Sequence, residues 1–270
     1  MVCRLVFRAA TPLVGSPEAG EASVSASDKA TEAWESAYLR FETPEEEIAK
    51  FTRRLLQLGA RQWPRDAAVL ELFCGRGNGL RAMAQLGFVR LAGVDISQRL
   101  LALCPPEHGR HCADCRTLPF VTASQDILIV QGGLHHLAAL PEDMEKVMAE
   151  ASRVLRPGGR FVVVEPWLTP FLSLVHAGCR QSWLRKISAK IDALAEMIDG
   201  ERSTYEQWLG QPEAVLGSLE ASFITERKSI GWGKLMWVGR RNGEWGMGNG
   251  ESGNRASRAV ADVRREGRGG

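Results

Sequence analysis

The stretch Val69-Leu-Glu-Leu-Phe-Cys-Gly75-Arg-Gly77-Asn-Gly79 changes from apolar to glycine-rich within one short segment. Its first half is an apolar run, the pattern of a buried parallel strand. Its second half is a glycine turn, after which apolar residues return at helical spacing from Leu80. Glycines let the backbone approach a ligand closely, and the N–H groups of a helix N-terminus face that ligand. The stretch therefore predicts a nucleotide-binding loop at the edge of an α/β sheet.

Two features of this loop indicate which nucleotide it suits. Glu71 lies within the predicted strand, where a buried carboxylate is costly without a partner, and a ligand with an ammonium group would supply one. The dinucleotide pattern G-x-G-x-x-G fits poorly, because a frame that starts at Gly75 places Leu80 where the third glycine belongs. The segment instead resembles motif I of the class I S-adenosylmethionine (SAM) dependent methyltransferases, E/D-x-x-x-G-x-G. Phe73 stands where that family often has another glycine.

Two acidic residues further along the chain extend the resemblance. Asp95 ends the predicted strand 89–95, 20 residues after the first glycine of the loop. An acid at that edge can accept hydrogen bonds from both hydroxyls of a ribose. It could instead cap the following helix, although Ser97 can make that cap equally well. Asp114 lies in the segment 111–120, which resembles the family segment A-D-A-x-x-L-P-F, whose acid contacts the adenine amino group.

The resemblance covers residues 30–240 and implies the fold class. We expect an α/β protein with a Rossmann-like, doubly wound sheet of seven strands. Its last strand is antiparallel, and a helical insertion separates strands 5 and 6. The stretch 156–159 matches the L-x-P-G-G turn that precedes the fifth strand in the family. Segments 222–231 and 234–239 are predicted to form the closing antiparallel pair, joined by a Gly-Trp-Gly turn.

The composition predicts one medium-sized domain with flexible ends. The predicted parts are a flexible leader, a methyltransferase domain that contains an acceptor-side insertion, and a disordered Gly- and Arg-rich tail: 1–27, 28–240 (insertion 168–219) and 241–270. A net charge of +2 implies no bulk attraction to nucleic acid, and no apolar run is long enough to span a membrane. Six scattered cysteines favour a reducing compartment, so a cytoplasmic location is predicted. A leader without acids before Glu18 leaves organelle targeting as the alternative.

The resemblance implies that SAM is the cofactor and S-adenosylhomocysteine (SAH) its product. Glu71 and the glycine loop would hold the methionine end, Asp95 the ribose and Asp114 the adenine. The full set of residues implied to bind the cofactor is Glu71, Phe73, Cys74, Gly75, Gly77, Asp95, Ile96, Asp114, Cys115 and Gln131.

Histidines and aromatic residues are the candidates for the acceptor side. His135 and His136 follow the predicted strand 125–131, at the edge where the methyl group would lie, so either could serve as a general base. Many similar methyltransferases carry a His-His-Leu segment that the chemistry does not require, which is the alternative. The aromatic residues predicted to line the acceptor pocket, for which ordinary packing is the alternative, are Trp34, Tyr38, Trp167 and Trp183.

Two further groups of polar residues in the sequence are candidates for binding a ligand. The basic residues of the insertion, which suit either a solvated amphipathic face or an anionic acceptor, are Arg180, Arg185, Lys186 and Lys190. The potential metal ligands that lie close in sequence are His108, His111, Cys112 and Cys115. Because alternate residues of a strand point to opposite faces and one C-x-x-C is too few, no metal site is predicted.

The predicted function is methyl transfer from SAM to an oxygen, nitrogen or carbon nucleophile of a small-molecule acceptor. Nothing resembles the Asn-Pro-Pro-Tyr-type clamp used on amide acceptors, so a protein acceptor is disfavoured. We expect no nucleic-acid partner and no membrane span, and the sequence predicts no particular oligomeric state. One alternative is a catalytically inactive, methyltransferase-like SAM-binding or scaffold protein. The other is a nicotinamide-dependent oxidoreductase, which the glycine spacing and the closing strand pair disfavour.

Overall fold

The computed structural model describes residues 26–243 of the chain. The predicted leader (1–27) and tail (241–270) therefore lie almost entirely outside the described residues. In the described part, none of the helices combines the length and the apolar character needed to cross a membrane.

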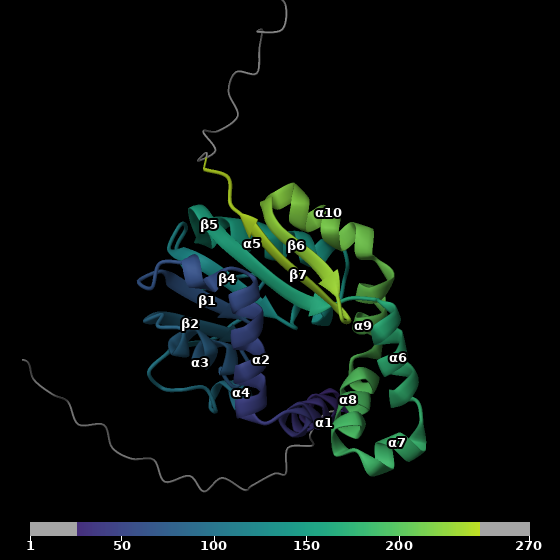
Figure 1. The fold of residues 1–270 in the computed structure, drawn as a ribbon. Coiled ribbons are helices and arrows are strands. Elements are labelled where there is room, and N and C mark those ends of the chain that lie inside the picture. Colours follow the sequence, from purple (N-terminus) through teal and green to yellow (C-terminus); the bar gives the residue numbers. More distant parts are fainter. Residues whose placement is uncertain (1–25, 244–270) are drawn as a thin grey trace, which may run out of the picture.

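Seven strands of the described residues form one sheet in the order β3-β2-β1-β4-β5-β7-β6 (Figure 1). The first five pair in parallel, whereas β7 runs antiparallel to both β5 and β6. The strands are β1 (Ala68–Leu72), β2 (Arg90–Asp95), β3 (Gly109–Cys112), β4 (Gln125–Gln131), β5 (Leu155–Pro166), β6 (Ile224–Gly231) and β7 (Lys234–Arg240). The predicted fold class is confirmed. The order reverses between β1 and β4, and ligands of doubly wound sheets bind outside the carboxyl ends of the strands at such a point.

Helices cover both faces of this sheet, which explains why β1 is a continuous apolar run apart from its glutamate. Leu70 and Leu72 of β1 belong to the core on the face covered by α5, α9 and α10, whereas Val69 belongs to the core beneath α2 and α3. The helices before the insertion are α1 (Ala26–Phe41), α2 (Pro44–Gln57), η1 (Ala60–Gln62), α3 (Asn78–Gln85), α4 (Gln98–Leu101), η2 (Leu134–His136) and α5 (Glu142–Val154). Those between β5 and β6 are α6 (Pro170–Cys179), α7 (Ser182–Ile187), α8 (Ala189–Gly200), α9 (Arg202–Gly210) and α10 (Pro212–Ser222).

The helices of the insertion have two different positions. α10 lies beside α5 on one face of the sheet and buries Val215 and Leu219 there. α6, α7 and α8 instead extend away from the sheet, and α8 packs against α1 (Figure 1). The first helix of the domain and the insertion, far apart in sequence, therefore lie side by side next to the carboxyl ends of the strands.

One sequence prediction needs correction within β5. The stretch 156–159 is predicted as a turn, but it forms the first part of β5. Gly158 has a φ of +78°, and the pairing of β5 with β4 is irregular between Gln125 and Ile127. The stretch keeps its extended form because Gly158 N–H donates to the carbonyl of Arg241, and Arg241 N–H donates to the carbonyl of Gly159. Residues typical of a turn here extend a strand because the chain after β7 supplies a pairing partner.

A reciprocal cap sets the start of α2, the helix that carries several side chains of the site. The hydroxyl of Thr43 accepts a hydrogen bond from Glu46 N–H at 3.2 Å, and the Glu46 carboxylate accepts one from Thr43 N–H at 3.2 Å. Pro44 occupies the first helical turn, where its missing N–H costs nothing. Together these features fix the start of α2 at Pro44.

We expect Thr43→Ala to lower the free energy of unfolding by about 1 kcal/mol, because the cap of α2 is lost. Thr43→Ser keeps the hydroxyl, so its free energy of unfolding should differ from that of the wild type by at most about 0.5 kcal/mol. Urea denaturation followed by circular dichroism measures both. Equal stability of the alanine and serine variants would show that the cap does not hold this helix.

Candidate functional site

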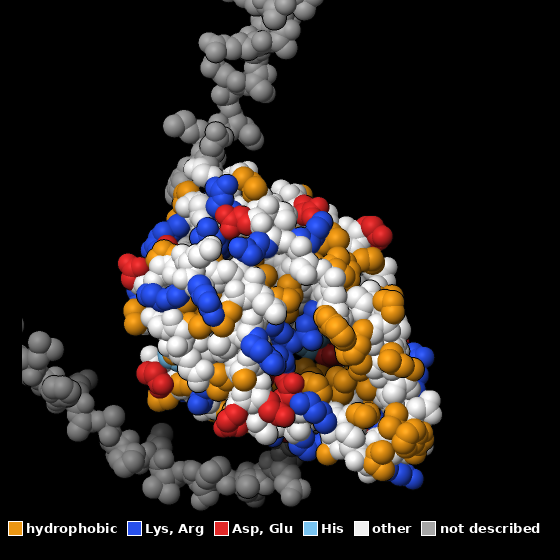
Figure 2. All heavy atoms as spheres, viewed as in Figure 1, with side chains coloured by type: hydrophobic (Ala, Val, Ile, Leu, Met, Phe, Trp, Pro, Cys, Tyr) orange, Lys and Arg blue, Asp and Glu red, His pale blue; other side chains and the backbone are white. Residues whose placement is uncertain are grey.

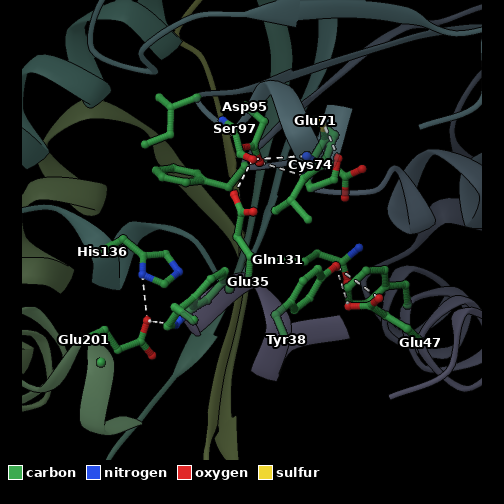
Figure 3. A pocket seen from close by; sticks show the side chains of 18 residues that line it. Glu35, Tyr38, Glu47, Glu71, Cys74, Asp95, Ser97, Gln131, His136 and Glu201 are labelled. Carbon is green, nitrogen blue, oxygen red and sulfur yellow. Dashed lines mark hydrogen bonds and ion pairs between the residues drawn. The ribbon is translucent and has the colours of Figure 1, made fainter. Parts of the chain in front are cut away.

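A cavity of about 370 Å³ lies at the carboxyl ends of β1, β2 and β4 (Figure 3). Its walls come from α1, α2, the turn after β1, the last residues of β2 and β4, and the junction of α8 with α9. We call it the loop cavity; Glu71, Gly75, Asp95, Gln131 and Tyr38 contribute to its lining. Its volume falls in the range of small-molecule sites, about 300–1,000 Å³.

The turn after β1 is held in place by Asp95. Gly75 has a φ of +51°, a left-handed conformation that glycine adopts without strain. Its N–H donates to Oδ2 of Asp95 at 2.8 Å, and Oδ1 of Asp95 accepts from Ser97 N–H at 2.8 Å. A side chain at Gly75 would bring Cβ to 3.2 Å from the Tyr38 hydroxyl. Asp95 thus clamps the loop to the end of β2, and Ser97 caps α4.

Glu71 is a buried carboxyl group that the protein leaves only partly satisfied. Its side chain is packed against the start of α3, where a Cβ added at Gly79 would lie 1.7 Å from Glu71 Oε1. Its Oε2 has no hydrogen-bond partner among the described residues, and neither has the Oε1 or the Nε2 of Gln131. Burial, and then the charge of Glu47, raise the pKa of Glu71 to about 8. Orphaned buried polar atoms in a cavity wall are typical of a ligand site.

A second buried glutamate, Glu47 of α2, is fully satisfied. It accepts hydrogen bonds from Arg76 at 2.9 and 3.2 Å, from Asn78 at 2.8 Å and from the Tyr38 hydroxyl at 3.2 and 3.3 Å. Arg76 also donates to the carbonyl of Glu42 at 2.7 Å. Burial and the charge of Glu47 raise the pKa of Tyr38 well above its usual range. The sequence places an acidic first turn at α2, but contains no signal for this tertiary network.

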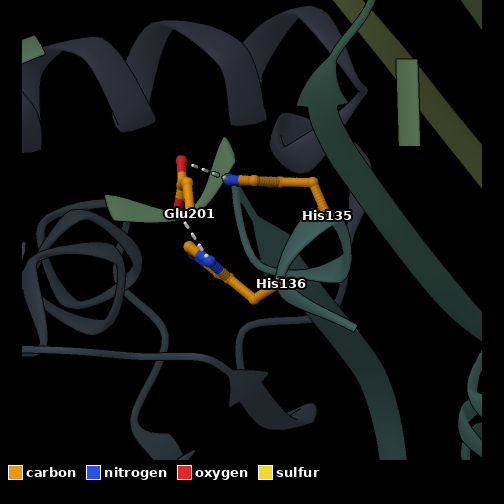
Figure 4. A group of neighbouring side chains, drawn as sticks. All are labelled: His135, His136 and Glu201. Carbon is orange, nitrogen blue, oxygen red and sulfur yellow. Dashed lines mark ion pairs between the residues drawn. The ribbon is translucent and has the colours of Figure 1, made fainter. Parts of the chain in front are cut away.

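Two histidines and two glutamates form a third group at the end of β4. Nδ1 of His135 lies 2.7 Å from Oε2 of Glu165, which is almost completely buried. Nε2 of His135 lies 3.5 Å from Oε1 of Glu201, and Nδ1 of His136 lies 2.8 Å from Oε2 of Glu201 (Figure 4). Trp34 of α1 donates to the same Glu201 oxygen at 3.0 Å. An ionised carboxylate only accepts hydrogen bonds, so the histidine nitrogens that face Glu165 and Glu201 carry hydrogens.

The two histidines of this group differ in their carboxylate partners. Burial opposes the charged form of His135, but the hydrogen bonds and charges of Glu165 and Glu201 outweigh it and raise the pKa of His135 to about 10. Burial also opposes ionisation of Glu201, yet the histidines lower its pKa to about 2. His135 is therefore a cation held between two carboxylates. Within residues 26–243, His136 has one carboxylate partner, Glu201, and it lines the loop cavity.

Among residues 26–243, one group has the spacing of metal ligands: His135, His136 and Glu201, whose ligand atoms lie within 4.8 Å of one another. No metal site is predicted from the sequence, in which Glu201 is far from the two histidines. The potential ligands that lie close in sequence around His111 and Cys112 of β3 do not form such a group in the described residues.

The predicted cofactor residues are divided between two adjoining cavities. Those that line the loop cavity are Glu71, Phe73, Cys74, Gly75, Asp95, Ile96 and Gln131. Asp114 and Cys115 line a smaller side cavity of about 140 Å³, which shares Phe73, Asp95, Ile96 and His136 with the first. The Asp114 carboxylate is already paired with Arg116 at 2.6 Å. Gly77 lines neither cavity. It caps the start of α3, where a Cβ added to it would lie 2.5 Å from Cys104 Sγ.

The predicted acceptor residues are placed in three different environments. Trp34 and Tyr38 of α1 stack with ring centroids 5.6 Å apart and line the loop cavity. Trp167 is buried in the sheet core, where its ring meets Trp208 edge-on at 6.4 Å. Trp183 on α7 is 59% exposed. The structure therefore does not bring Trp167 and Trp183 to the cavity, since the core takes up the first and solvent surrounds the second.

A second cavity, also of about 370 Å³, lies beneath the helical insertion. It shares Tyr38, Gln131 and His136 with the loop cavity, and apolar side chains such as Leu172 of α6 and Met197 of α8 line much of the rest. We call it the insertion cavity. Two chambers thus meet at the carboxyl end of β4, next to His136.

Comparison with known proteins identifies relatives of this chain. Residues 70–163 match the family model described as "Methyltransferase domain". The chain is 34% identical to the ubiquinone/menaquinone biosynthesis C-methyltransferase UbiE of Syntrophotalea carbinolica, over 56% of this chain and 69% of that protein. It is 30% identical to the 27-O-demethylrifamycin SV methyltransferase of Amycolatopsis mediterranei, over 64% of this chain and 63% of that protein. Across four curated relatives the chain spans 37%, 63%, 72% and 55% of the relative's own length.

A solved structure shares the fold. A protein of Methanococcus maripaludis assigned to the S-adenosyl-L-methionine-dependent methyltransferases superposes with a TM-score of 0.53 at 12% identity. The match covers 86% of this chain and 99% of that chain.

The pKa of Glu71 yields a prediction about stability. This pKa rises from an ordinary value near 4.5 to about 8 on folding, so the fold disfavours the charged carboxylate. The cost is absent below pH 4.5 and grows as the pH rises toward 8. We therefore expect Glu71→Gln to raise the free energy of unfolding of the unliganded protein by about 1–3 kcal/mol at neutral pH, and not in acid.

Urea denaturation at several pH values measures this effect. Glu145→Gln removes the same charge from an exposed position on α5 and serves as the control, with an expected change of at most about 0.5 kcal/mol. A Glu71→Gln variant less stable than wild type at neutral pH would mean that the ionised carboxylate is satisfied within the protein.

Proposed function

The chain belongs to the class I SAM-dependent methyltransferases, and we propose that it methylates an oxygen, nitrogen or carbon nucleophile of a small-molecule acceptor. The observation that carries this proposal is the meeting of two chambers beside His136. A nucleophile held in the insertion cavity would face a ligand held in the loop cavity without crossing bulk water. The relatives named as C- and O-methyltransferases act on small molecules, which supports the same class of acceptor here.

The orphaned polar atoms of the loop cavity fit SAM. Glu71 Oε2 and the amide of Gln131 lack partners, and an ammonium and a carboxylate of the methionine end would supply them. Asp95 already accepts two backbone hydrogen bonds, but each of its oxygens can accept a second, as a ribose requires. Asp114 and Cys115, in the adjoining side cavity, would contact the adenine. Bound there, SAM supplies an electrophilic methyl group on a sulfonium sulfur.

The histidines would have different roles. Glu201 holds Nδ1–H of His136, which leaves Nε2 as the nitrogen able to accept a proton from an acceptor hydroxyl. A carboxylate that orients a histidine in this way is the arrangement found in catalytic triads. His135, a cation between Glu165 and Glu201, would position Glu201 rather than accept a proton. For an acceptor that is already nucleophilic, alignment and exclusion of water would carry most of the rate.

The first test is calorimetric titration with SAM, SAH and NADH. We expect SAM and SAH to bind with dissociation constants of about 1–100 μM and NADH not to bind. Gly79→Ala should weaken SAH by at least about tenfold, because the added Cβ takes the space of the Glu71 carboxylate. Gly217→Ala, at an exposed position of α10 where an added Cβ has no neighbour within 4 Å, is the matched control and should bind SAH normally. If well-folded wild type bound neither sulfur nucleotide, the proposed function would fail.

The second test is turnover with hydroxyl, amine and carbon nucleophiles, followed by mass spectrometry of the product. With a hydroxyl acceptor, we expect His136→Gln to lower kcat by about 10²–10⁴ and Glu201→Gln to lower it less, while SAH affinity is kept. His108→Gln, in the turn before β3, is the control.

A chelator separates the two chemical roles that the group around Glu201 could have. Full activity after treatment with EDTA is expected for a base. Loss of activity that a divalent cation restores would instead make His135, His136 and Glu201 metal ligands. Binding of SAM without turnover of any acceptor would favour a non-catalytic SAM-binding protein.

A further inference from the structure

The outer end of the insertion cavity gathers positive charge. Lys50 and Arg54 of α2 line it together with Lys234 at the start of β7. Figure 2 shows Lys and Arg side chains clustered at the centre of this face, next to a hollow that hydrophobic side chains border. Apolar side chains of α6 and α8, such as Leu172 and Met197, line another part of the wall, and the polar group of His135, His136 and Glu201 lines a third. The cavity therefore combines a cationic end and an apolar wall with the histidine group.

Two of these three cations have no acidic partner. Lys50 pairs with Glu42. For Arg54 and Lys234, no carboxylate of the described residues lies within ion-pair distance. Glu226 of β6, the acid of the adjoining groove, is shared by other arginines and is not available to them.

Burial makes the lack of a partner costly. Arg54 and Lys234 are both half-buried. Burial, and then the charges of Arg54 and Lys50, lower the pKa of Lys234 to about 8. Burial also lowers the pKa of Arg54 to about 10. Two partly desolvated like charges that line the same cavity are unfavourable, and an anion bound by both would relieve this cost.

Basic side chains also line a groove that adjoins the insertion cavity. Arg54, Trp232 and Lys234 also line an open groove of about 760 Å³ between α2 and β6. Arg227 of β6 lies in this groove and has no ion-pair partner among the described residues. Trp232 is 78% exposed, and its ring meets Phe171 edge-on at 5.3 Å. An apolar rim thus stands beside the unpaired cations.

The basic residues of the insertion do not contribute to this site. Arg185 pairs with Asp192 at 2.9 Å, and Lys190 pairs with Glu46 at 3.4 Å. Arg180 lines a separate cavity. Lys186 is exposed on α7. None of these four basic residues therefore lines the insertion cavity, and the cations that do so come from α2 and β7.

Building on the proposed function, we propose that the methyl acceptor is an amphipathic acid. Its acidic group, a carboxylate or a phosphate, binds Arg54 and Lys234, its apolar body packs against α6 and α8, and its nucleophile lies at the His136 end. The planar guanidinium of Arg54 suits either acid, since both present paired oxygens.

Binding of aromatic probes tests this proposal without knowledge of the acceptor. Naphthoate, naphthyl phosphate and naphthol share one ring system and differ in charge. Each would compete with anilinonaphthalene sulfonate, followed by its fluorescence, on the full-length protein with and without saturating SAH. We expect at least one of the two acids to bind about tenfold more tightly than naphthol. Whichever acid binds better identifies the acidic group.

Single substitutions assign the site. Lys234→Met and Arg54→Met keep an apolar stem and should each weaken the preferred acid about fivefold or more, with naphthol unchanged. Lys186→Met removes one charge from an exposed position of α7 and should leave the affinities of all three probes unchanged. The comparison of acid with naphthol on wild type needs no variant, so it holds even if a substitution impairs folding.

The opposite results would overturn the proposal. Naphthol binding as tightly as both acids would show that charge is not recognised. Equal losses in Lys186→Met and Lys234→Met would show a diffuse effect of net charge. Binding of a single-stranded oligonucleotide more tightly than naphthyl phosphate would assign the cations to nucleic acid instead. SAH affinity, measured in parallel, reports on the cofactor site, so failure of the proposed function is seen separately.

Discussion

The buried carboxylate of Glu47 is the interaction on which the cofactor side of the molecule depends. It joins three elements: α2, which carries it, α1 through Tyr38, and the glycine loop through Arg76 and Asn78. A buried charge is stable only when it is paired and fully hydrogen-bonded. A shift of any of these elements would break its bond to Glu47 and lower the stability of the fold by about 3–5 kcal/mol. The loop is therefore held in shape before any ligand arrives. The same negative charge contributes to the raised pKa of the neighbouring Glu71, the glutamate left incomplete.

Glu201 has a corresponding role on the acceptor side of the molecule, where it joins several elements. It stands between α8 and α9 and contacts both histidines of η2 as well as Trp34 of α1. α1 therefore contacts both glutamates, Glu47 through Tyr38 and Glu201 through Trp34 one helical turn earlier, and the two rings stack within 9° of parallel. This helix forms a wall common to the loop cavity and the insertion cavity. A displacement of α1 would alter the two chambers together, which gives a physical reason for one helix to border both.

The parts of the molecule that the sequence predicts well are those in which residues close in sequence act together. The loop after β1, Asp95 at the end of β2 and the bounds of β4 follow from strand–loop–helix spacing, and the structure confirms the sheet that they build. Glu201 carries no local signal, because its role depends on how the insertion folds back on η2. The placement of Trp167 and Trp183 away from the cavities could not be predicted from the sequence for a related reason. Aromatic character alone does not say whether a side chain turns toward the core, the cavity or solvent.

The groups that this protein leaves unsatisfied differ in sign between its two chambers. The loop cavity ends in an unpaired carboxyl oxygen of Glu71, whereas the insertion cavity ends in the unpaired cations of Arg54 and Lys234. A cationic ligand therefore gains at the first and is repelled at the second, and an acid experiences the reverse. Specificity is a difference between affinities, and repulsion contributes to it as much as attraction does. Two chambers whose unpaired groups prefer ligand groups of opposite charge thus favour one arrangement, with each ligand in its own chamber and the reacting atoms at the junction beside His136.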